Sequence, residues 1–240
     1  MLRAKRALGQ NFLKDKNICN KITNLTNINN KVVLEIGPGY GFLTDVILKK
    51  SPKKLYIIEK DFELSIYLKK KYNLNKKVII INDDILNMKL NTFKEVLIIS
   101  NLPYNISTKI ITHLFNFNEN INEMIFMIQR EVAKKFDYLL PRMNKYKFLT
   151  KIVSTYHRCF DVSPNVFIPK PKVTSTVVKF TFNKKVFNLR KAENFSNLIF
   201  KNIRKKISSK MNNKSGKHIL YEKRVDQLSI DEILDIYNFF

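Results

Sequence analysis

The segment KVVLEIGPGYGFLT, residues 31–44, decides the fold class of this 240-residue chain. Its apolar part, residues 32–36, is short and ends in a turn, which is typical of a buried parallel strand. The chain has five glycines, and three of them, Gly37, Gly39 and Gly41, follow this strand within five positions. A strand, a glycine turn and a helix in this order predict a Rossmann-like α/β sheet, in which a nucleotide ligand contacts bare backbone.

The spacing of the glycines separates two kinds of cofactor. A dinucleotide fingerprint, G-x-G-x-x-G, requires glycine where this chain has Phe42, whereas G-x-G-x-G after Glu35 is present. This pattern favours S-adenosylmethionine over a pyrophosphate cofactor, because no phosphate has to be placed at the helix N-terminus. We therefore predict S-adenosylmethionine as the cofactor, with Gly37 and Gly39 in its site.

Acidic residues follow the next two expected strands. The strand at residues 55–58 ends in Glu59, about 20 residues beyond the glycines, where a carboxylate accepts both ribose hydroxyls of an adenosine. A helix is expected at 61–72, and a strand at 78–81 then ends in an Asn-Asp-Asp turn. We assign the adenine amine of the cofactor to Asp84, because the apolar residues after it return the chain to the core.

The turn NLPYNIS, residues 101–107, follows another apolar strand and offers hydrogen-bond acceptors beside an aromatic ring. The acceptors are the carboxamide oxygen of Asn101 and the main-chain carbonyls of Leu102 and Pro103, and the ring is that of Tyr104. Two acceptors would orient the exocyclic amine of a nucleobase stacked on the ring, and would favour the positive charge that grows as this nitrogen attacks an electrophile. The alternative interpretation is a turn that merely closes a strand.

Composition indicates the partner and the compartment. Lys and Arg number 44 against 20 Asp and Glu, a formal net charge of +24 that predicts a polyanionic partner, most simply nucleic acid. AT-rich coding is an alternative source of some of the lysines. Cys19 and Cys159 are isolated, so we expect no disulfide, no metal site and a reducing cytoplasm. No apolar run approaches about 18 residues, and the N-terminus has no hydrophobic signal core, so no membrane association is expected.

Several motifs in order give a resemblance to a known family. They are QNFL (10–13), EIGPGYGFLT (35–44), DIL (84–86), NLPYNIST (101–108), MIQREVA (127–133) and FIPKPKVTSTVV (167–178). The chain resembles the ribosomal RNA adenine dimethyltransferases of the kasugamycin-resistance type, from Gln10 to about Leu234. The resemblance implies a class I S-adenosylmethionine-dependent methyltransferase that dimethylates N6 of two adjacent adenines in the 3′-terminal hairpin loop of small-subunit rRNA. It implies cofactor contacts at Asn11, Leu13, Gly37, Glu59, Asp84 and Asn101.

The resemblance also bears on two loops. In the proline-stiffened loop 165–172 it favours Phe167 as the cover for the second face of an extruded adenine opposite Tyr104, where the residues alone equally allow a core side chain. Residues 137–149 depart from the family, which usually has a Gly-Arg pair after Tyr146, so the RNA contacts of this loop stay open. The residues expected near RNA phosphates are Arg130, Lys134, Lys170, Lys172, Arg204, Lys205 and Lys206.

We predict two domains. Residues 1–186 form the methyltransferase domain, with a helix at 151–156 and strands at 159–162 and 175–182 as the terminal antiparallel pair of a seven-stranded sheet. Residues 187–240 form a small α-helical domain that contacts RNA. One of its helices would place Phe200, Ile203, Ile207 and Met211 on one face and basic residues off it. A capping box at Ser229 and Glu232 predicts a final helix.

Three other functions share parts of this pattern. A large-subunit rRNA dimethylase of the macrolide-resistance type would have the same fold. A DNA adenine methylase has a similar turn, but this chain has no sizeable target-recognition insertion. A non-enzymatic ribosome-assembly or transcription factor with a relic cofactor site is the remaining class, and the complete set of site residues argues against it. We expect a monomer that acts on the small ribosomal subunit.

Overall fold

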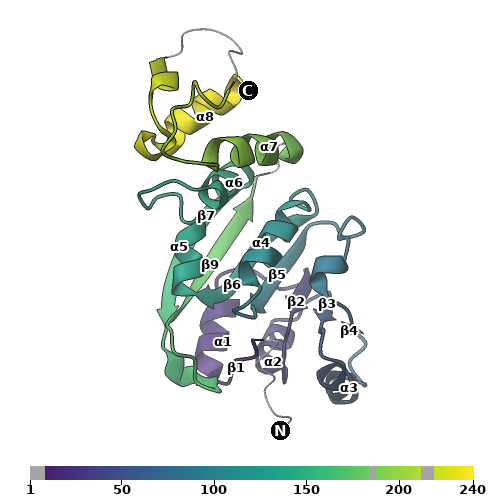
Figure 1. Cartoon of the computed structure of the whole chain (residues 1–240). Helices are drawn as coiled ribbons and strands as arrows, with labels where there is room; N and C mark the ends of the chain where they lie inside the picture. Colours follow the sequence, from purple (N-terminus) through teal and green to yellow (C-terminus); the bar gives the residue numbers. More distant parts are fainter. Residues whose placement is uncertain (1–8, 184–187, 212–218) are drawn as a thin grey trace. The chain divides into compact units, whose positions relative to one another are not determined.

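A computed structural model describes residues 9–183, 188–211 and 219–240 of the chain (Figure 1). The chain forms two compact units, Met1–Ala133 with His157–Lys184 and Lys134–Tyr156 with Lys185–Phe240. This division differs from the predicted domains 1–186 and 187–240, because residues 134–156 belong to the second unit. The predicted boundary itself, like the basic residues before Gly9, lies outside the described residues.

The elements follow one another as alternating strands and helices (Figure 1). The strands are β1 Phe12–Leu13, β2 Val32–Ile36, β3 Lys54–Ile58, β4 Val78–Ile81, β5 Val96–Asn101, β6 Ile121–Gln129, β7 Ser154–Val162, β8 Phe167–Ile168 and β9 Ser175–Phe182. The helices are α1 Lys16–Thr23, α2 Phe42–Lys49, α3 Phe62–Lys71, α4 Ser107–Phe115, α5 Arg130–Phe136, α6 Lys145–Val153, α7 Leu189–Phe200 and α8 Ile230–Asn238. Short 3₁₀ helices are η2 Ile85–Asn87, η3 Pro164–Val166, η4 Ile219–Glu222 and η5 Val225–Gln227.

Within the described residues, seven strands form one sheet in the order β4-β3-β2-β5-β6-β9-β7. Strands β4, β3, β2, β5 and β6 are parallel, and β9 is antiparallel to β6. The predicted seven-stranded methyltransferase sheet is therefore confirmed. Because Ile36 pairs with Ile58 and Ile58 with Ile81, the carboxyl ends of β2, β3 and β4 lie next to one another. The chain segments that follow these strands consequently share one edge of the sheet.

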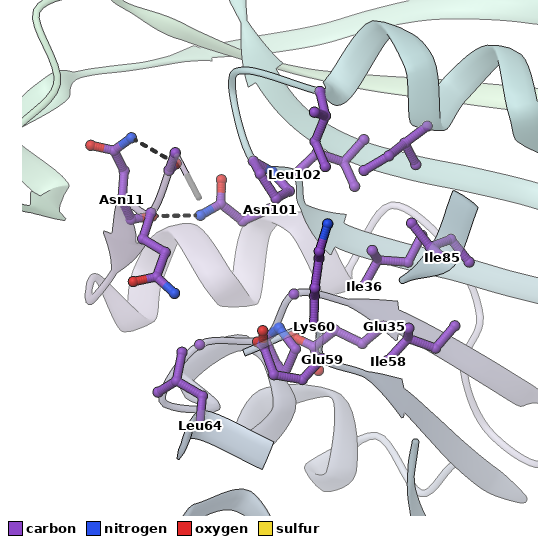
Figure 2. Close-up of a pocket in the computed structure, with 18 of the residues that line it drawn as sticks. Asn11, Glu35, Ile36, Ile58, Glu59, Lys60, Leu64, Ile85, Asn101 and Leu102 are labelled. Carbon is purple, nitrogen blue, oxygen red and sulfur yellow. Dashed lines mark hydrogen bonds between the residues drawn. The ribbon is translucent and has the colours of Figure 1, made fainter. Parts of the chain in front are cut away.

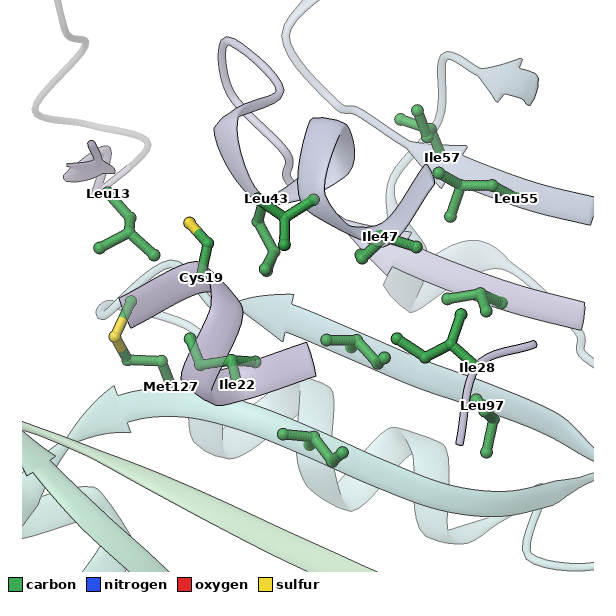
Figure 3. Close-up of a cluster of buried hydrophobic side chains, with 14 of the residues drawn as sticks. Leu13, Cys19, Ile22, Ile28, Leu43, Ile47, Leu55, Ile57, Leu97 and Met127 are labelled. Carbon is green, nitrogen blue, oxygen red and sulfur yellow. The ribbon is translucent and has the colours of Figure 1, made fainter. Parts of the chain in front are cut away.

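The parallel strands are mostly apolar because helices cover both faces of the sheet. Figure 3 shows Cys19 and Ile22 of α1 and Leu43 and Ile47 of α2 gathered with strand residues such as Leu97. On alternate strand positions, Phe126 and Phe180 pack together, and Phe115 of α4 lies 6.0 Å from the Phe180 ring. Each strand therefore contributes side chains to two cores, which fixes its register.

A two-stranded sheet attaches the N-terminal segment to the loop before β9. Phe12 of β1 pairs with Ile168 of β8, and Leu13 pairs with Phe167. The Lys14 backbone N–H donates to the Val166 carbonyl at 3.0 Å. This pairing holds the N-terminal segment beside the edge of the main sheet where β2 and β5 end.

The second unit has an aromatic core that the sequence analysis did not assign. Phe148 of α6 is fully buried, and its ring lies 5.2 Å from that of Phe195 and 5.4 Å from that of Tyr237. Residues 134–156 belong to this unit because α6 supplies the centre of that core. Lys147 is also buried and donates to the carbonyls of Leu140 and Pro141, both at 2.7 Å. At the two positions where the family usually has Gly-Arg, this chain has Lys147, which binds the carbonyls of the preceding loop, and Phe148, which lies in the core.

Two predicted helices are wrong in their extent. Residues 151–156 are not one helix, because α6 ends at Val153 and β7 begins at Ser154. The expected helix through Phe200, Ile203, Ile207 and Met211 ends at Phe200. Beyond it the Ile207 N–H donates to the Lys223 carbonyl at 3.1 Å and Lys206 bridges Arg224, so pairing with a distant segment replaces helical hydrogen bonds.

The final helix is confirmed. Ser229 and Glu232 form a reciprocal capping box at the start of α8, with the Ser229 N–H 2.8 Å from the Glu232 carboxylate. Ile233 and Ile236 of this helix are buried. None of the helices in the described ranges has both the length and the apolar character needed to cross a lipid bilayer.

Candidate active site at the strand ends

A cavity of about 300 Å³ opens at the carboxyl ends of β2, β3, β4 and β5, a size within the usual range of small-molecule sites. Its walls come from five separate stretches of the sequence, several of which are labelled in Figure 2. The predicted residues that line it are Asn11, Leu13, Gly37, Gly39, Glu59, Asp84, Asn101, Pro103 and Tyr104. The structure therefore brings every predicted cofactor residue, and three of the four predicted catalytic residues, around a common space.

The glycine turn forms one wall with bare backbone. Gly37 and Gly39 have φ of +61° and +59°, which side chains rarely adopt. A Cβ atom on Gly39 would lie 2.5 Å from the ring of Phe12, so the N-terminal segment and the turn fit only with glycine there. The Gly37 N–H donates to the Ile58 carbonyl at 2.8 Å, which ties the turn to β3.

Glu59 is a buried carboxylate at the end of β3, 6% exposed. Its Oε1 accepts the Asp61 N–H at 2.8 Å. Burial raises the pKa of Glu59 to about 7, although the backbone N–H groups of Asp61 and Gly39 act in the opposite direction. A carboxylate that is removed from water but faces a cavity is suited to accept hydrogen bonds from two hydroxyl groups of a ligand.

Asp84 lies at the end of β4 and is held by two donors. Its Oδ1 accepts the Leu86 N–H at 3.0 Å, and its Oδ2 lies 2.8 Å from Nζ of Lys60. Burial raises the pKa of this carboxyl, but Lys60 and the Leu86 N–H outweigh it, so the pKa of Asp84 is held below its ordinary value. The Asp84 carboxyl is therefore ionised in the folded protein near neutral pH.

Asn101, at the end of β5, presents an acceptor without a partner in the part of the chain that the structure describes. Its Oδ1 is buried and accepts no hydrogen bond, while its Nδ2 donates to the Asn11 carbonyl at 2.9 Å (Figure 2). That bond fixes the amide so that oxygen and nitrogen have different roles. A buried polar atom without a partner is costly, and a ligand that donates a hydrogen bond removes this cost.

Tyr104 lines the cavity, and its hydroxyl lies 2.5 Å from Oγ of Ser175 on β9. Phe167 does not line the cavity. It is 2% exposed, and its ring meets that of Tyr104 edge to face, with centroids 6.5 Å apart and planes at 71°. The expected position of Phe167 as a second flat cover is therefore not what the structure shows, because pairing of β8 with β1 directs this side chain into the core.

Two cavity residues were missed at the level of sequence. Lys60 has the pattern of an ordinary surface lysine after a strand, and only the pairing of β3 with β4 brings it to Asp84. Glu35 is 1% exposed and accepts the Thr44 hydroxyl at 2.6 Å, and burial raises its pKa to about 8. Its acidic position beside the glycines was noted, but its burial depends on α2 closing over it.

The residues expected to contact RNA are all exposed: Arg130, Lys134, Lys170, Lys172, Arg204, Lys205 and Lys206. Lys206 also pairs with Glu222 at 2.8 Å. They divide between the two units, with Arg130, Lys170 and Lys172 in the first. Among the described residues no cluster of His, Cys, Asp and Glu is arranged to hold a metal ion.

These observations fit an adenosine-containing sulfonium cofactor. The glycine turn leaves the backbone open to a ligand, and Glu59 and Asp84 can accept hydrogen bonds from hydroxyl and amine groups. Asn101 Oδ1, which has no partner among the described residues, can accept one more. Among the described residues that line the cavity, the one lysine is Lys60, and it is paired with Asp84.

Comparison with known proteins agrees with this site. The family model for ribosomal RNA adenine dimethylase matches residues 1–240. Ribosomal RNA small subunit methyltransferase A of Pelagibacter ubique is 38% identical over 94% of this chain and 90% of its own length. The protein of the same name from a Hydrogenobaculum species is 36% identical, with 99% and 94% of the two chains covered.

Two solved structures share the fold. A dimethyladenosine transferase from Plasmodium falciparum superposes with a TM-score of 0.78 at 22% identity, covering 95% of this chain and 97% of the other. The 23S rRNA methyltransferase ErmE superposes with a TM-score of 0.75 at 20% identity, covering 95% and 99%. At these identities the likeness concerns the class I methyltransferase fold, with its sheet and C-terminal helices.

Proposed function

The chain belongs to the ribosomal RNA adenine dimethylase family, and from this we propose that it dimethylates N6 of two adjacent adenines in the 3′-terminal hairpin loop of small-subunit rRNA. It is an enzyme that uses S-adenosylmethionine as methyl donor. Relatives that share over a third of their sequence with this chain have the name ribosomal RNA small subunit methyltransferase A, which favours the small subunit over the large one.

We assign the cofactor to the wall formed by β2, β3 and β4. Glu59 accepts the ribose hydroxyls, Asp84 accepts the adenine amine, and Gly37 and Gly39 leave the backbone open to the ligand. Asn11 and Leu13 close the site from the N-terminal segment, which Asn101 holds through the Asn11 carbonyl at 2.9 Å. When bound, S-adenosylmethionine supplies an electrophilic methyl group on a positively charged sulfur.

We assign the target adenine to the turn after β5. The Asn101 Oδ1 and the Pro103 carbonyl accept the two N–H bonds of the exocyclic amine and aim its nitrogen at the methyl group. Both acceptors stabilise the positive charge that develops on nitrogen during the attack. Tyr104 packs against the base, and its hydroxyl is held by Ser175. The proton leaves to water after the bond has formed, so no general base is needed.

The observation that carries this proposal is the buried, unpaired Oδ1 of Asn101 in a cavity that Glu59 and Asp84 also line. An acceptor with nothing to accept is explained by a donor that arrives with the substrate. Ordinary strand closure would leave no reason for this atom to face a cavity lined by two carboxylates.

The oligomeric state, the compartment and the ribosomal partner are part of the same proposal. We propose that the protein acts as a monomer in the cytoplasm on the assembled small ribosomal subunit. The free thiols Cys19 and Cys159 suit a reducing compartment. The exposed basic residues of both units, among them Lys170 and Arg204, suit contacts with RNA phosphates.

The test is transfer of labelled methyl groups to small subunits that lack these methyls, followed by base analysis of the RNA. The expected product is N6,N6-dimethyladenosine at two adjacent positions. Large subunits and duplex DNA serve as competing substrates in the same assay. Methylation of large-subunit RNA alone would replace this assignment with the macrolide-resistance activity, and absence of cofactor binding in calorimetry would favour a non-enzymatic factor.

A further inference from the structure

Lys60 lines the cavity and has no role in the assignments above. It follows Glu59 at the end of β3, and Figure 2 labels the two residues next to each other. Its Nζ lies 2.8 Å from Asp84 Oδ2, with side-chain exposures of 58% for Lys60 and 17% for Asp84. The ion pair therefore lies at the rim of the cavity and connects the ends of two adjacent strands.

The backbone of Lys60 is also held in place. Asn82 donates through Nδ2 to the Glu59 carbonyl at 2.7 Å and, less closely, to the Lys60 carbonyl at 3.4 Å. The register that pairs Ile58 with Ile81 places the carboxyl ends of β3 and β4 side by side. Lys60 thus begins beside the carboxylate assigned to the ribose and ends on the carboxylate assigned to the adenine.

The Asp84 carboxylate has a defined orientation because each of its oxygens has one donor. Leu86 N–H occupies Oδ1 at 3.0 Å, and Lys60 occupies Oδ2. A carboxylate oxygen accepts two hydrogen bonds, so each still has room for one more. The other charged groups near this carboxyl are His113 of α4 and Asp83, whose Oδ1 accepts the Asp84 N–H at 2.6 Å.

Of the two donors to Asp84, only Lys60 donates through its side chain, so only this hydrogen bond can be removed by a substitution. Without the Lys60 ammonium, the Asp84 carboxylate would keep only the hydrogen bond from the Leu86 N–H, and its Oδ2 would be free to rotate toward water. An ionised carboxylate accepts hydrogen bonds only, so its orientation decides whether an amino group on a purine ring finds an acceptor.

We propose that Lys60 is a positioning residue which, by holding the Asp84 carboxylate across the strand ends, makes the cavity specific for the amino group of the adenine in its cofactor. The inference rests on the assignment of the cavity to S-adenosylmethionine. Lys60 does not contact the amine in this account; it acts through Asp84. Its side chain connects the ribose and adenine subsites, so that one strand end orients both.

The first test is a double-mutant cycle on cofactor-product affinity in the full-length protein. Calorimetry measures the Kd of S-adenosylhomocysteine for wild type, Lys60→Met, Asp84→Ala and the double variant. Lys60→Met should weaken binding about threefold to fivefold, the size expected for a partly exposed ion pair, and Lys60→Arg should restore it. In the Asp84→Ala background the same change should have less than about a twofold effect, because the partner is gone.

The matched control is Lys54→Met, an exposed lysine at the other end of β3, which should bind like wild type. Equal effects of Lys60→Met with and without Asp84 would overturn the proposal. So would a variant that binds the product normally but needs more ribosomal subunit for half-maximal rate, since Lys60 would then contact RNA. If wild type itself bound no S-adenosylhomocysteine, the assigned function would fail first.

The second test compares ligands. Wild type should bind S-adenosylhomocysteine more tightly than its analogue with hydrogen in place of the 6-amino group, by about tenfold for a hydrogen bond to a charged acceptor. Lys60→Met should narrow that ratio, while Lys60→Arg should keep it. An equal loss of affinity for both ligands would contradict an action on the amine and overturn the proposal.

Discussion

The two ends of the cavity use different chemistry. At the end formed by β2, β3 and β4, the polar groups are carboxylates, with Glu59 buried and Asp84 paired to Lys60. At the end formed by the turn after β5, the acceptors are a neutral amide and a backbone carbonyl, from Asn101 and Pro103. In the proposed assignment, charged groups hold the cofactor, and neutral groups hold the nitrogen that reacts.

This difference has a physical reason. A carboxylate beside the reacting amine would change its protonation with pH and compete for the departing proton. An amide oxygen and a peptide carbonyl keep the same state at every pH at which the protein is folded, and they stabilise a growing positive charge without being protonated by it. Changes at the first end should consequently alter binding, and changes at the second should alter the rate of transfer.

The largest effect is expected for Asn101→Ala. Removing the Oδ1 acceptor should lower the single-turnover rate of methyl transfer at saturating cofactor by about a hundredfold to a thousandfold, as removal of one preorganised group does elsewhere. Rapid quenching with labelled cofactor measures that rate. Asn73→Ala, an exposed asparagine outside the cavity lining, is the control. A variant that transferred at the wild-type rate once saturated would place Asn101 at the cofactor end and break the comparison.

Next in size is Glu59→Gln. Loss of the charged acceptor for the ribose hydroxyls should raise the Kd of S-adenosylmethionine about tenfold to a hundredfold, the range for hydrogen bonds to charged groups. The transfer rate at saturation should stay within about twofold, because Glu59 does not face the reacting nitrogen. Calorimetry and single-turnover kinetics measure the two quantities. Glu63→Gln, an exposed carboxylate on α3, is the matched control.

The pH dependence of cofactor binding should have the same origin. Burial raises the pKa of Glu59 to about 7, so below that pH the carboxyl holds a proton and accepts ribose hydroxyls poorly. Affinity should therefore rise with pH, by about tenfold between pH 6 and pH 8, and the dependence should disappear in Glu59→Gln. Glu35→Gln is the control, because burial raises the pKa of this second carboxyl to about 8, and the dependence should persist in that variant. A steep dependence of the saturated transfer rate would contradict the division between the two ends.

The sequence predicts for a local reason that Gly37, Glu59 and Asp84 gather at the carboxyl ends of β2, β3 and β4. Buried parallel strands are short apolar runs, and residues such as Glu59 and Asp84 come directly after them, so a parallel sheet must bring them together. The degree of burial of Glu59 and the contact of Lys60 with Asp84 were not predictable in the same way. The pKa of Glu59 depends on what covers it, and the Lys60 contact depends on the register of β3 against β4.

The predictions that differ from the structure, for Phe167 and for the helix through Ile207, have one cause, which is pairing between distant segments. Phe167 lies in the core because β8 pairs with β1, about 150 residues earlier in the chain. Ile207 is buried at helical spacing from Met211, yet its backbone N–H donates to the carbonyl of the distant Lys223. A pattern of apolar residues records that a side chain is buried, but it does not record which segment buries it.

The smallest effect should come from the Tyr104 hydroxyl, which sharpens the comparison within the target end itself. Tyr104→Phe keeps the ring that packs on the base and removes only the contact with Ser175 Oγ at 2.5 Å. We expect about a threefold loss in kcat/KM, the size of one neutral hydrogen bond that orients a side chain. Ser175→Ala should give the same loss, and the double variant no more, because both changes break one interaction. If Tyr104→Phe slowed transfer as much as Asn101→Ala, the Tyr104 hydroxyl would take part in the chemistry. The reaction would then depend on a titratable group at the end of the cavity that we assign to neutral acceptors.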